Sequence, residues 1–154
     1  MVKNNIAKTC KPSFCIIVPM YNEENNVSMC VKTICDFLKK LENRCLLLVV
    51  DDGSSDKTLI KLNKLKKKYN NLSLLKHPKN LGYGAANKTG VIFAHKENYK
   101  YVLYMDADLT QNTKYIFDFI DLMNQNIDFI KATRYAFGGG SRGVSKFRKI
   151  ISKG

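Results

Sequence analysis

The chain has 154 residues, of which 45% are hydrophobic and 25% are charged, a balance that excludes a disordered chain and fits one globular domain. It contains no apolar run long enough to cross a bilayer and no signal-peptide pattern at its N-terminus. The net charge of +13 predicts an anionic partner, and charge alone does not choose between nucleic acid, anionic lipid and a phosphorylated substrate.

Apolar strands and amphipathic helices alternate along the chain. We interpret residues 1–12 as a basic arm and expect residues 13–154 to belong to the domain. We expect strands at 14–18 (ended by Pro19), 45–50, 72–75, 101–105 and 129–132. We expect helices at 27–41, from near 56 to 69, at 85–95 and at 113–124. Strands that are apolar throughout and alternate with helices predict an α/β fold, in which helices cover both faces of a mostly parallel sheet.

Chemically reactive side chains follow four of these strands. In such sheets ligands bind beyond the carboxyl ends of the strands, so the residues that follow each strand are the candidates for a binding site. Carboxylates follow the first, second and fourth strands, and an arginine follows the fifth. Asp106 and Asp108 are separated only by Ala107, so their charges repel unless a cation lies nearby. Oxygen ligands suit Mg²⁺ or Mn²⁺ better than zinc.

Four motifs occur in a characteristic order: 18–23 (VPMYNE), 49–56 (VVDDGSSD), 80–82 (NLG) and 106–108 (DAD). Together they resemble the signatures of family 2 glycosyltransferases with the GT-A fold. The segments 106–109, 133–135, 138–140 and 148–154 are similar to the dolichyl-phosphate mannose synthase branch, whose enzymes transfer a sugar from a nucleotide to the phosphate of a polyprenyl lipid. Because the last segment leads into further catalytic sequence in that family, we expect the domain to be incomplete.

The resemblance implies a nucleotide site. Asp52 is expected to accept a hydrogen bond from the edge of uracil or guanine. Gly82 and Gly84 would permit a close turn beside the nucleotide, or simply belong to a loop. The base and ribose would be surrounded by Pro19, Tyr21 and Glu23.

The resemblance also implies a metal site at the DxD motif. Asp106 would lie near the ribose or a metal-bound water, and Asp108 would bind Mg²⁺ or Mn²⁺ directly. The metal would bridge the donor diphosphate and offset the charge that develops on the leaving nucleotide. The branch often has a glutamine two residues after the second aspartate, where this chain has Thr110, so Gln111 is the displaced candidate for a third ligand.

Two arginines are candidates for holding the acceptor. A guanidinium makes two parallel hydrogen bonds to phosphate, so Arg134 and Arg148 could hold an acceptor monophosphate against the anomeric carbon. Such a phosphate has a second pKa of ~6, so it would attack without a protein base. Direct in-line attack would invert the anomeric configuration. Alternatively, Arg148 is one more cation on a basic helix, and residues 138–140 are either a flap or a linker.

Several residues also have simpler interpretations. Asp51 either faces inward or caps the turn, and we expect one of Asp51, Asp52 and Ser54 to cap the second helix. His77 and His95 lack metal-ligand spacing and are interpreted as incidental. The five cysteines lack the spacing of a zinc site and are interpreted as buried thiols in a reducing cytosol.

The sequence therefore predicts an inverting, metal-dependent transferase at the cytoplasmic face of a membrane. The donor would be GDP-mannose, slightly ahead of UDP-glucose, the acceptor a dolichyl or undecaprenyl phosphate, and the basic surface would face anionic lipid. One alternative is a family 2 enzyme that acts on a sugar hydroxyl in capsule or cell-wall synthesis; it requires a carboxylate base that we do not find. Another is a nucleic-acid-binding module, but the lysine run 61–68 lacks interleaved aromatics, so no nucleic-acid partner is expected.

Overall fold

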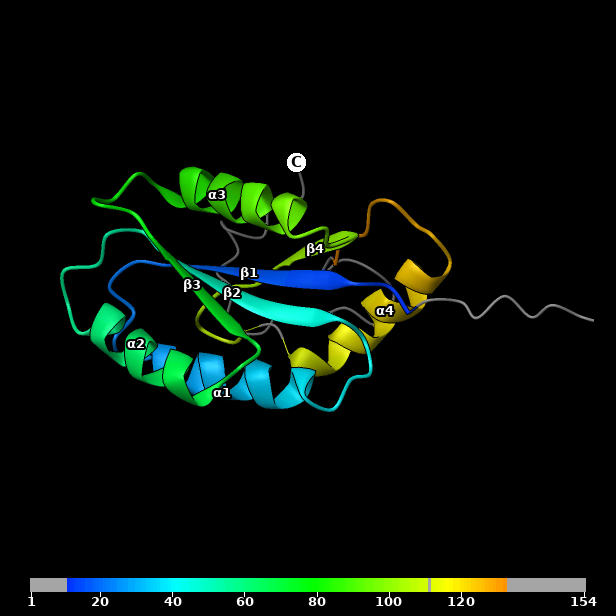
Figure 1. Ribbon diagram of the computed structural model, residues 1–154, viewed down its shortest axis with the longest axis horizontal. Coiled ribbons are helices and arrows are strands. Elements are labelled where there is room, and N and C mark those ends of the chain that lie inside the picture. Colours follow the sequence, from blue (N-terminus) through cyan, green and yellow to red (C-terminus); the bar gives the residue numbers. More distant parts are fainter. Residues whose placement is uncertain (1–10, 111, 133–154) are drawn as a thin grey trace, which may run out of the picture.

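The computed structural model describes residues 11–110 and 112–132 of the chain. Its sheet contains four parallel strands in the order β3-β2-β1-β4 (Figure 1). The strands are β1 (Phe14–Met20), β2 (Cys45–Asp51), β3 (Leu72–Lys76) and β4 (Tyr101–Tyr104). The helices are α1 (Val27–Leu38), α2 (Thr58–Lys68), α3 (Tyr83–Lys96) and α4 (Ile116–Asn124), the last preceded by the short 3-10 helix η1 (Thr113–Tyr115). The prediction of an α/β fold with a parallel sheet is confirmed.

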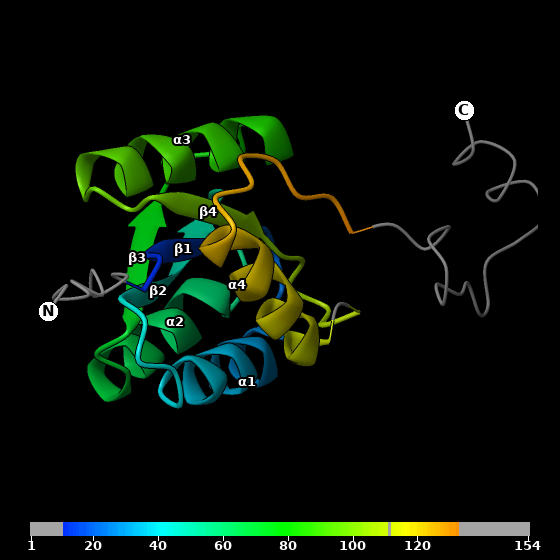
Figure 2. The ribbon, with the colours of Figure 1, turned by 90° about the vertical axis from the view of Figure 1, so that its right-hand side faces the viewer.

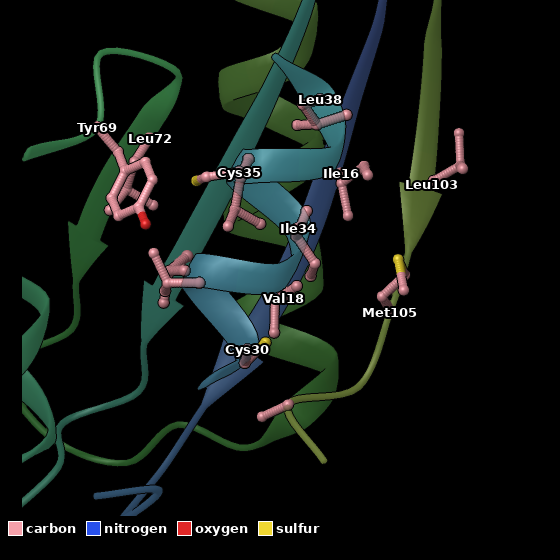
Figure 3. Packing of buried hydrophobic residues seen from close by; sticks show 14 of the residues in the cluster. Ile16, Val18, Cys30, Ile34, Cys35, Leu38, Tyr69, Leu72, Leu103 and Met105 are labelled. Carbon is pink, nitrogen blue, oxygen red and sulfur yellow. The ribbon is translucent and has the colours of Figure 1, made fainter. Parts of the chain in front are cut away.

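Helices cover both faces of the sheet. Helix α3 lies on one face, and α1 and α2 lie on the other (Figure 2). Successive residues of a strand point to opposite faces, which is why β1 is apolar throughout. Ile16 belongs to the larger buried cluster with α1 and α4, part of which is seen in Figure 3, whereas Ile17 belongs to a smaller cluster with Ala86 and Ala94 of α3.

Strand β1 continues through Pro19, so the prediction that Pro19 ends the strand was wrong. The Ile17 carbonyl accepts from Met105 N–H on the β4 side, and the Met20 carbonyl accepts from Asp52 N–H on the β2 side. By alternation, Pro19 faces the β4 side. The pairing of β1 with β4 ends at Ile17, so no strand partner requires the N–H that Pro19 lacks.

The predicted fifth strand at 129–132 is absent, and this prediction was also wrong. Phe129 is 81% exposed, and among these four residues only Ile130 rests partly against the core. A strand is held in place by ladder hydrogen bonds and by burying one face, and the described fold leaves the apolar side chains of this segment largely exposed.

Because the strands are parallel, their carboxyl ends share one edge of the sheet. The loops that follow β1, β2 and β3 lie together at the left of Figure 1. Helices α1 and α2 run back from this edge, so their C-terminal lysines lie at the opposite one. There the ammonium groups of Lys39 and Lys68 lie 4.5 and 5.6 Å from the centroid of the Tyr69 ring. Within the described residues, no helix is both long and apolar enough to cross a membrane.

The cysteines of the described part of the chain are unpaired. Cys15, Cys30 and Cys35 are buried and Cys45 is half-buried, which agrees with the interpretation as packed thiols. Burial raises the pKa of the Cys30 thiol to about 12, so it is protonated at neutral pH. Cys10 lies outside the described residues.

Candidate functional site

A cleft of about 360 Å³ opens at the edge where the strands end. Its walls come from the ends of β1 and β2, the start of α3 and the residues after β4. The cleft contains six of the seven residues that the sequence analysis placed at the nucleotide, all but Gly84: Pro19, Tyr21, Glu23, Asp52, Gly82 and Asp106. The other lining residues are Met20, Asn80, Tyr83, Ala86, Ala107 and Asp108. The fold therefore brings residues from four distant segments to one concave surface.

The wall after β1 is fastened to the loop after β2. Asn22 adopts a left-handed backbone conformation with φ of 55°. Its N–H donates to Ser54 Oγ at 3.0 Å, and its side-chain oxygen accepts from Ser55 N–H at 2.9 Å. These bonds fix the backbone between Tyr21, whose side chain is 46% exposed, and Glu23. Both side chains are thus presented to the cleft from an anchored loop.

The N-cap residue of α2, Lys57, makes no side-chain capping bond, and the expectation that Asp51, Asp52 or Ser54 would cap this helix was wrong. The first N–H of the helix, that of Thr58, instead donates to Asp56 Oδ1 at 2.9 Å. Ser54 is engaged with the β1 loop instead, and Asp51 is completely buried, which is the inward orientation considered for it. The capping prediction failed because the turn between Asp52 and α2 is longer than we assumed, so only Asp56 lies close enough.

Asp52 is held by hydrogen bonds from three residues at the wall of the cleft. Its carboxylate accepts from Leu81 N–H at 2.9 Å, from Gly82 N–H at 2.8 Å and faces His77 Nδ1 at 2.7 Å. Burial raises the pKa of Asp52, but these three hydrogen bonds outweigh burial and hold it below its usual value. Asp52 is therefore an ionised acceptor at neutral pH although it is only 3% exposed.

His77 lies behind the cleft and contacts it through Asp52, an arrangement that its interpretation as incidental did not anticipate. It is 8% exposed, and its Nε2 lies 2.9 Å from Thr89 Oγ1 of α3. Its backbone N–H donates to the Asp51 carbonyl at 2.9 Å, which extends the β2–β3 ladder by one residue. The sequence carried a signal, because His77 lies two residues beyond the predicted strand at 72–75, at the same edge of the sheet as the carboxylates. Metal-ligand spacing does not reveal a histidine of this kind.

The segment that surrounds Asp52, residues 77–82, is named here the donor loop. Gly82 has φ of 92°, which only glycine adopts easily and which turns its N–H toward Asp52. Gly53 has φ of 73°, and a Cβ there would lie 2.4 Å from the carbonyl carbon of Lys79. Gly84, by contrast, lies in α3 with open space around it, so the close turn depends on Gly82.

The two aspartates of the DxD motif face the cleft together. The segment after β4 alternates, with Met105 and Ala107 buried and Asp106 and Asp108 exposed on the cleft side. Asp108 Oδ1 accepts from the N–H of Thr110 at 3.0 Å, which closes a tight turn. Buried small and apolar residues thus anchor the segment and direct both carboxylates outward.

Three predicted site residues, Gln111, Arg134 and Arg148, lie outside the described residues, as do residues 138–140. The structure consequently describes the donor side of the predicted site and not the acceptor side. Asn80 also lines the cleft; the sequence analysis quoted it within the 80–82 motif without giving it a role, and Tyr83 was not singled out from the sequence.

Four carboxylates line the cleft of a chain whose net charge is +13: Glu23, Asp52, Asp106 and Asp108. No cluster of three or more metal-ligating side chains occurs within the described part of the chain. Proteins often hold Mg²⁺ with one or two carboxylates while the substrate's phosphates and water complete the coordination. Asp106 and Asp108 are suited to that role.

Comparison with known proteins identifies relatives. Residues 15–152 match the family described as glycosyl transferase family 2. A curated relative, dolichyl-phosphate beta-glucosyltransferase ALG5A of Trichomonas vaginalis, is 32% identical over 150 residues, which cover 90% of this chain. The chain spans only 45% of that relative's length.

Solved structures share the fold. S. aureus TarS 1-349 in complex with UDP-GlcNAc has a TM-score of 0.55 and 30% identity over 71% of this chain and 31% of that chain. The mannosyltransferase PcManGT from Pyrobaculum calidifontis, in complex with GDP-Man and Mn²⁺, has a TM-score of 0.60 and 20% identity over 74% of this chain and 32% of that chain.

Proposed function

This chain belongs to glycosyl transferase family 2, and on that premise we propose that it binds a nucleotide sugar whose sugar is transferred, with inversion, to a polyprenyl phosphate. The observation that carries the proposal is the cleft, in which a buried, ionised Asp52 lies among the same lining residues as the outward carboxylates of Asp106 and Asp108. A base-recognising acceptor and a metal-binding pair on one surface suit the two ends of a nucleoside diphosphate.

The donor is a UDP-sugar. The motifs alone placed GDP-mannose slightly ahead, but the relative seen with UDP-GlcNAc is more similar in sequence than the one seen with GDP-Man. Asp52 accepts a hydrogen bond from the base, and the exposed ring of Tyr21 offers an aromatic face beside it.

The metal is Mg²⁺ or Mn²⁺, held by Asp106 and Asp108 together with the donor diphosphate. When bound, the ion neutralises the charge that develops on the departing nucleotide. The orientation of the two carboxylates and the absence of a larger ligand cluster in the described residues both support an ion that arrives with its nucleotide.

The acceptor is a polyprenyl phosphate, a proposal supported by the name of the dolichyl-phosphate relative. Its phosphate is ionised near neutral pH, since its second pKa is near ~6, so the attacking oxygen requires no protein base. Arg134 and Arg148 are the residues proposed to hold it, and Gln111 is the proposed third metal ligand.

The lysine-rich end of α2 bears on the proposed membrane contact. The seven-residue strands β1 and β2 separate the two edges of the sheet by roughly 23 Å. Lysines at the far edge can bind anionic headgroups, but they do not deliver the acceptor phosphate to the cleft. In this proposal the lysines at the far edge attach the protein to the cytoplasmic face of the membrane, and a different surface, beside the cleft, binds the acceptor.

The test is transfer of labelled sugar from UDP-glucose and from GDP-mannose to undecaprenyl phosphate with Mn²⁺. We expect transfer from UDP-glucose that is lost with EDTA and in Asp108→Ala. Transfer that persists under both conditions would refute the metal role. Thermal stabilisation of the chain by oligonucleotides alone, with none from UDP or GDP, would favour a nucleic-acid-binding module instead.

A further inference from the structure

We propose that His77 is a positioning residue that orients Asp52 so that one lone pair of its Oδ2 remains available to an N–H of the nucleobase. The inference rests on the proposed nucleotide-binding function and assigns a new residue to it. His77 lines neither the cleft nor the metal pair, and it acts through Asp52.

The protonation of the ring follows from its partners. Ionised Asp52 can only accept hydrogen bonds, so the proton of the 2.7 Å contact resides on His77 Nδ1. The opposite nitrogen, Nε2, faces the hydroxyl of Thr89, which can donate or accept. The imidazole is therefore held at both ends, between β2 and α3, and its Nδ1–H points in a fixed direction.

Counting lone pairs shows what is left for a ligand. A carboxylate oxygen offers about two acceptor positions. Oδ1 of Asp52 uses both, for His77 Nδ1–H and for Leu81 N–H. Oδ2 has a single donor, Gly82 N–H, and that donor is shared with Asn80 Oδ1 at 2.9 Å. Oδ2 is thus the oxygen with spare acceptor capacity.

This arrangement selects the base. Uracil N3 and guanine N1 carry a hydrogen that Oδ2 can accept, whereas the matching ring nitrogens of cytosine and adenine carry a lone pair that a carboxylate repels. Without His77, Oδ1 would keep one donor, and an N–H of the base could pair with either oxygen after a rotation of the carboxylate. Loss of His77 should therefore weaken recognition of the base and leave recognition of the diphosphate intact.

Two substitutions separate the two ends of the ring. In His77→Asn the side-chain amide nitrogen can occupy the place of Nδ1, so the donor to Asp52 is retained. In His77→Gln the amide reaches the place of Nε2, so contact with Thr89 is retained and the donor to Asp52 is lost. Both variants are polar, and urea denaturation verifies that each is folded.

The experiment is isothermal titration of the 154-residue chain with UDP, with GDP and with inorganic pyrophosphate, each with Mn²⁺. A hydrogen bond to a charged group leads us to expect that His77→Gln weakens binding of UDP or GDP by roughly tenfold or more. His77→Asn should retain their affinity within about threefold, and pyrophosphate should bind all three chains alike. Thr89→Val, which keeps His77 and frees one end of the ring, should show the same base-specific loss to a smaller extent.

Three results would overturn the inference: unchanged nucleotide affinity in His77→Gln, an equal loss for pyrophosphate, or an Asn variant as weak as the Gln variant. The second result would mean that His77 is merely structural. A wild-type chain that binds pyrophosphate but neither UDP nor GDP would contradict the proposed function as well, so the two failures are distinguishable.

Discussion

Three glycines around the cleft permit a graded test of the donor loop. Gly53 combines a positive φ with a crowded site, Gly82 has a positive φ and open space, and Gly84 has neither restriction. Substituting each with alanine adds one methyl group to three different environments. The series therefore separates the cost of backbone conformation from the cost of the steric clash.

The expected magnitudes follow from these geometries. Gly82 combines φ of 92° with ψ of 158°, a conformation that is essentially reserved for glycine and costs another residue about 1–3 kcal/mol, which is the whole effect expected for Gly82→Ala. In Gly53→Ala the new Cβ would lie 2.4 Å from the carbonyl carbon of Lys79, and backbone atoms must retreat by about 1 Å to reach ordinary contact. Such overpacking adds about 1–3 kcal/mol. Gly84→Ala should stabilise α3 by up to about 1 kcal/mol.

Urea denaturation gives the free energies of unfolding, and titration with UDP reports on the site. From the most to the least stable, we expect the order Gly84→Ala, wild type, Gly82→Ala and Gly53→Ala. Gly53→Ala should also weaken UDP binding, because the displaced loop carries the Leu81 and Gly82 N–H groups away from Asp52. Equal stabilities of the Gly53 and Gly82 variants would refute the close approach of the donor loop to Gly53.

Three further predictions concern other parts of the chain. The pKa of Asp52 is lowered in the folded chain, so its contribution to the free energy of unfolding is complete above pH ~4 and is lost as pH falls through the folded-state pKa. In Asp52→Asn, the free energy of unfolding measured by urea denaturation should therefore fall less steeply at acid pH than in wild type. A fall as steep as in wild type would contradict this. The Cys30 thiol, with its pKa raised to about 12, should resist iodoacetamide at pH 8 until urea unfolds the chain, as read by peptide mass spectrometry, and rapid labelling of the folded chain would contradict its burial. Alanine at Lys66, Lys67 and Lys68 should weaken binding to anionic vesicles in sedimentation assays by about 1 kcal/mol per lysine. The affinity for UDP should stay the same, because these residues lie at the far edge of the sheet. Unchanged vesicle binding would exclude these lysines as the membrane-binding surface.

The main elements and the lining of the cleft were predictable because they depend on local patterns. Continuous apolar runs identified β1 to β4, and parallel strands must end at a common edge, so reading the residues after each strand led to Asp52, Asp106 and Asp108. No three-dimensional information was needed for this step.

Three of the failures depend on partners that are distant in sequence. Whether Pro19 ends β1 depends on the length of β4, because Pro19 faces β4 and lacks the N–H that a longer β4 would need for a ladder hydrogen bond. The role of His77 depends on Asp52 and Thr89, which lie 25 and 12 residues away. The predicted strand at 129–132 had the right composition, but the described fold offers it no place to bury a face.

The central claim is that the cleft binds a nucleoside diphosphate through Asp52 at the base and through Asp106 and Asp108 at the metal. Isothermal titration of UDP into wild type, Asp52→Ala and Asp108→Ala, each with and without Mn²⁺, tests it most directly. We expect saturable, Mn²⁺-dependent binding of UDP to wild type and loss of the Mn²⁺ dependence in Asp108→Ala. In a parallel titration with CDP, wild type should prefer UDP, and Asp52→Ala should lose this preference. Binding that is equally strong in all three chains and indifferent to Mn²⁺, or no binding to any of them, would contradict it.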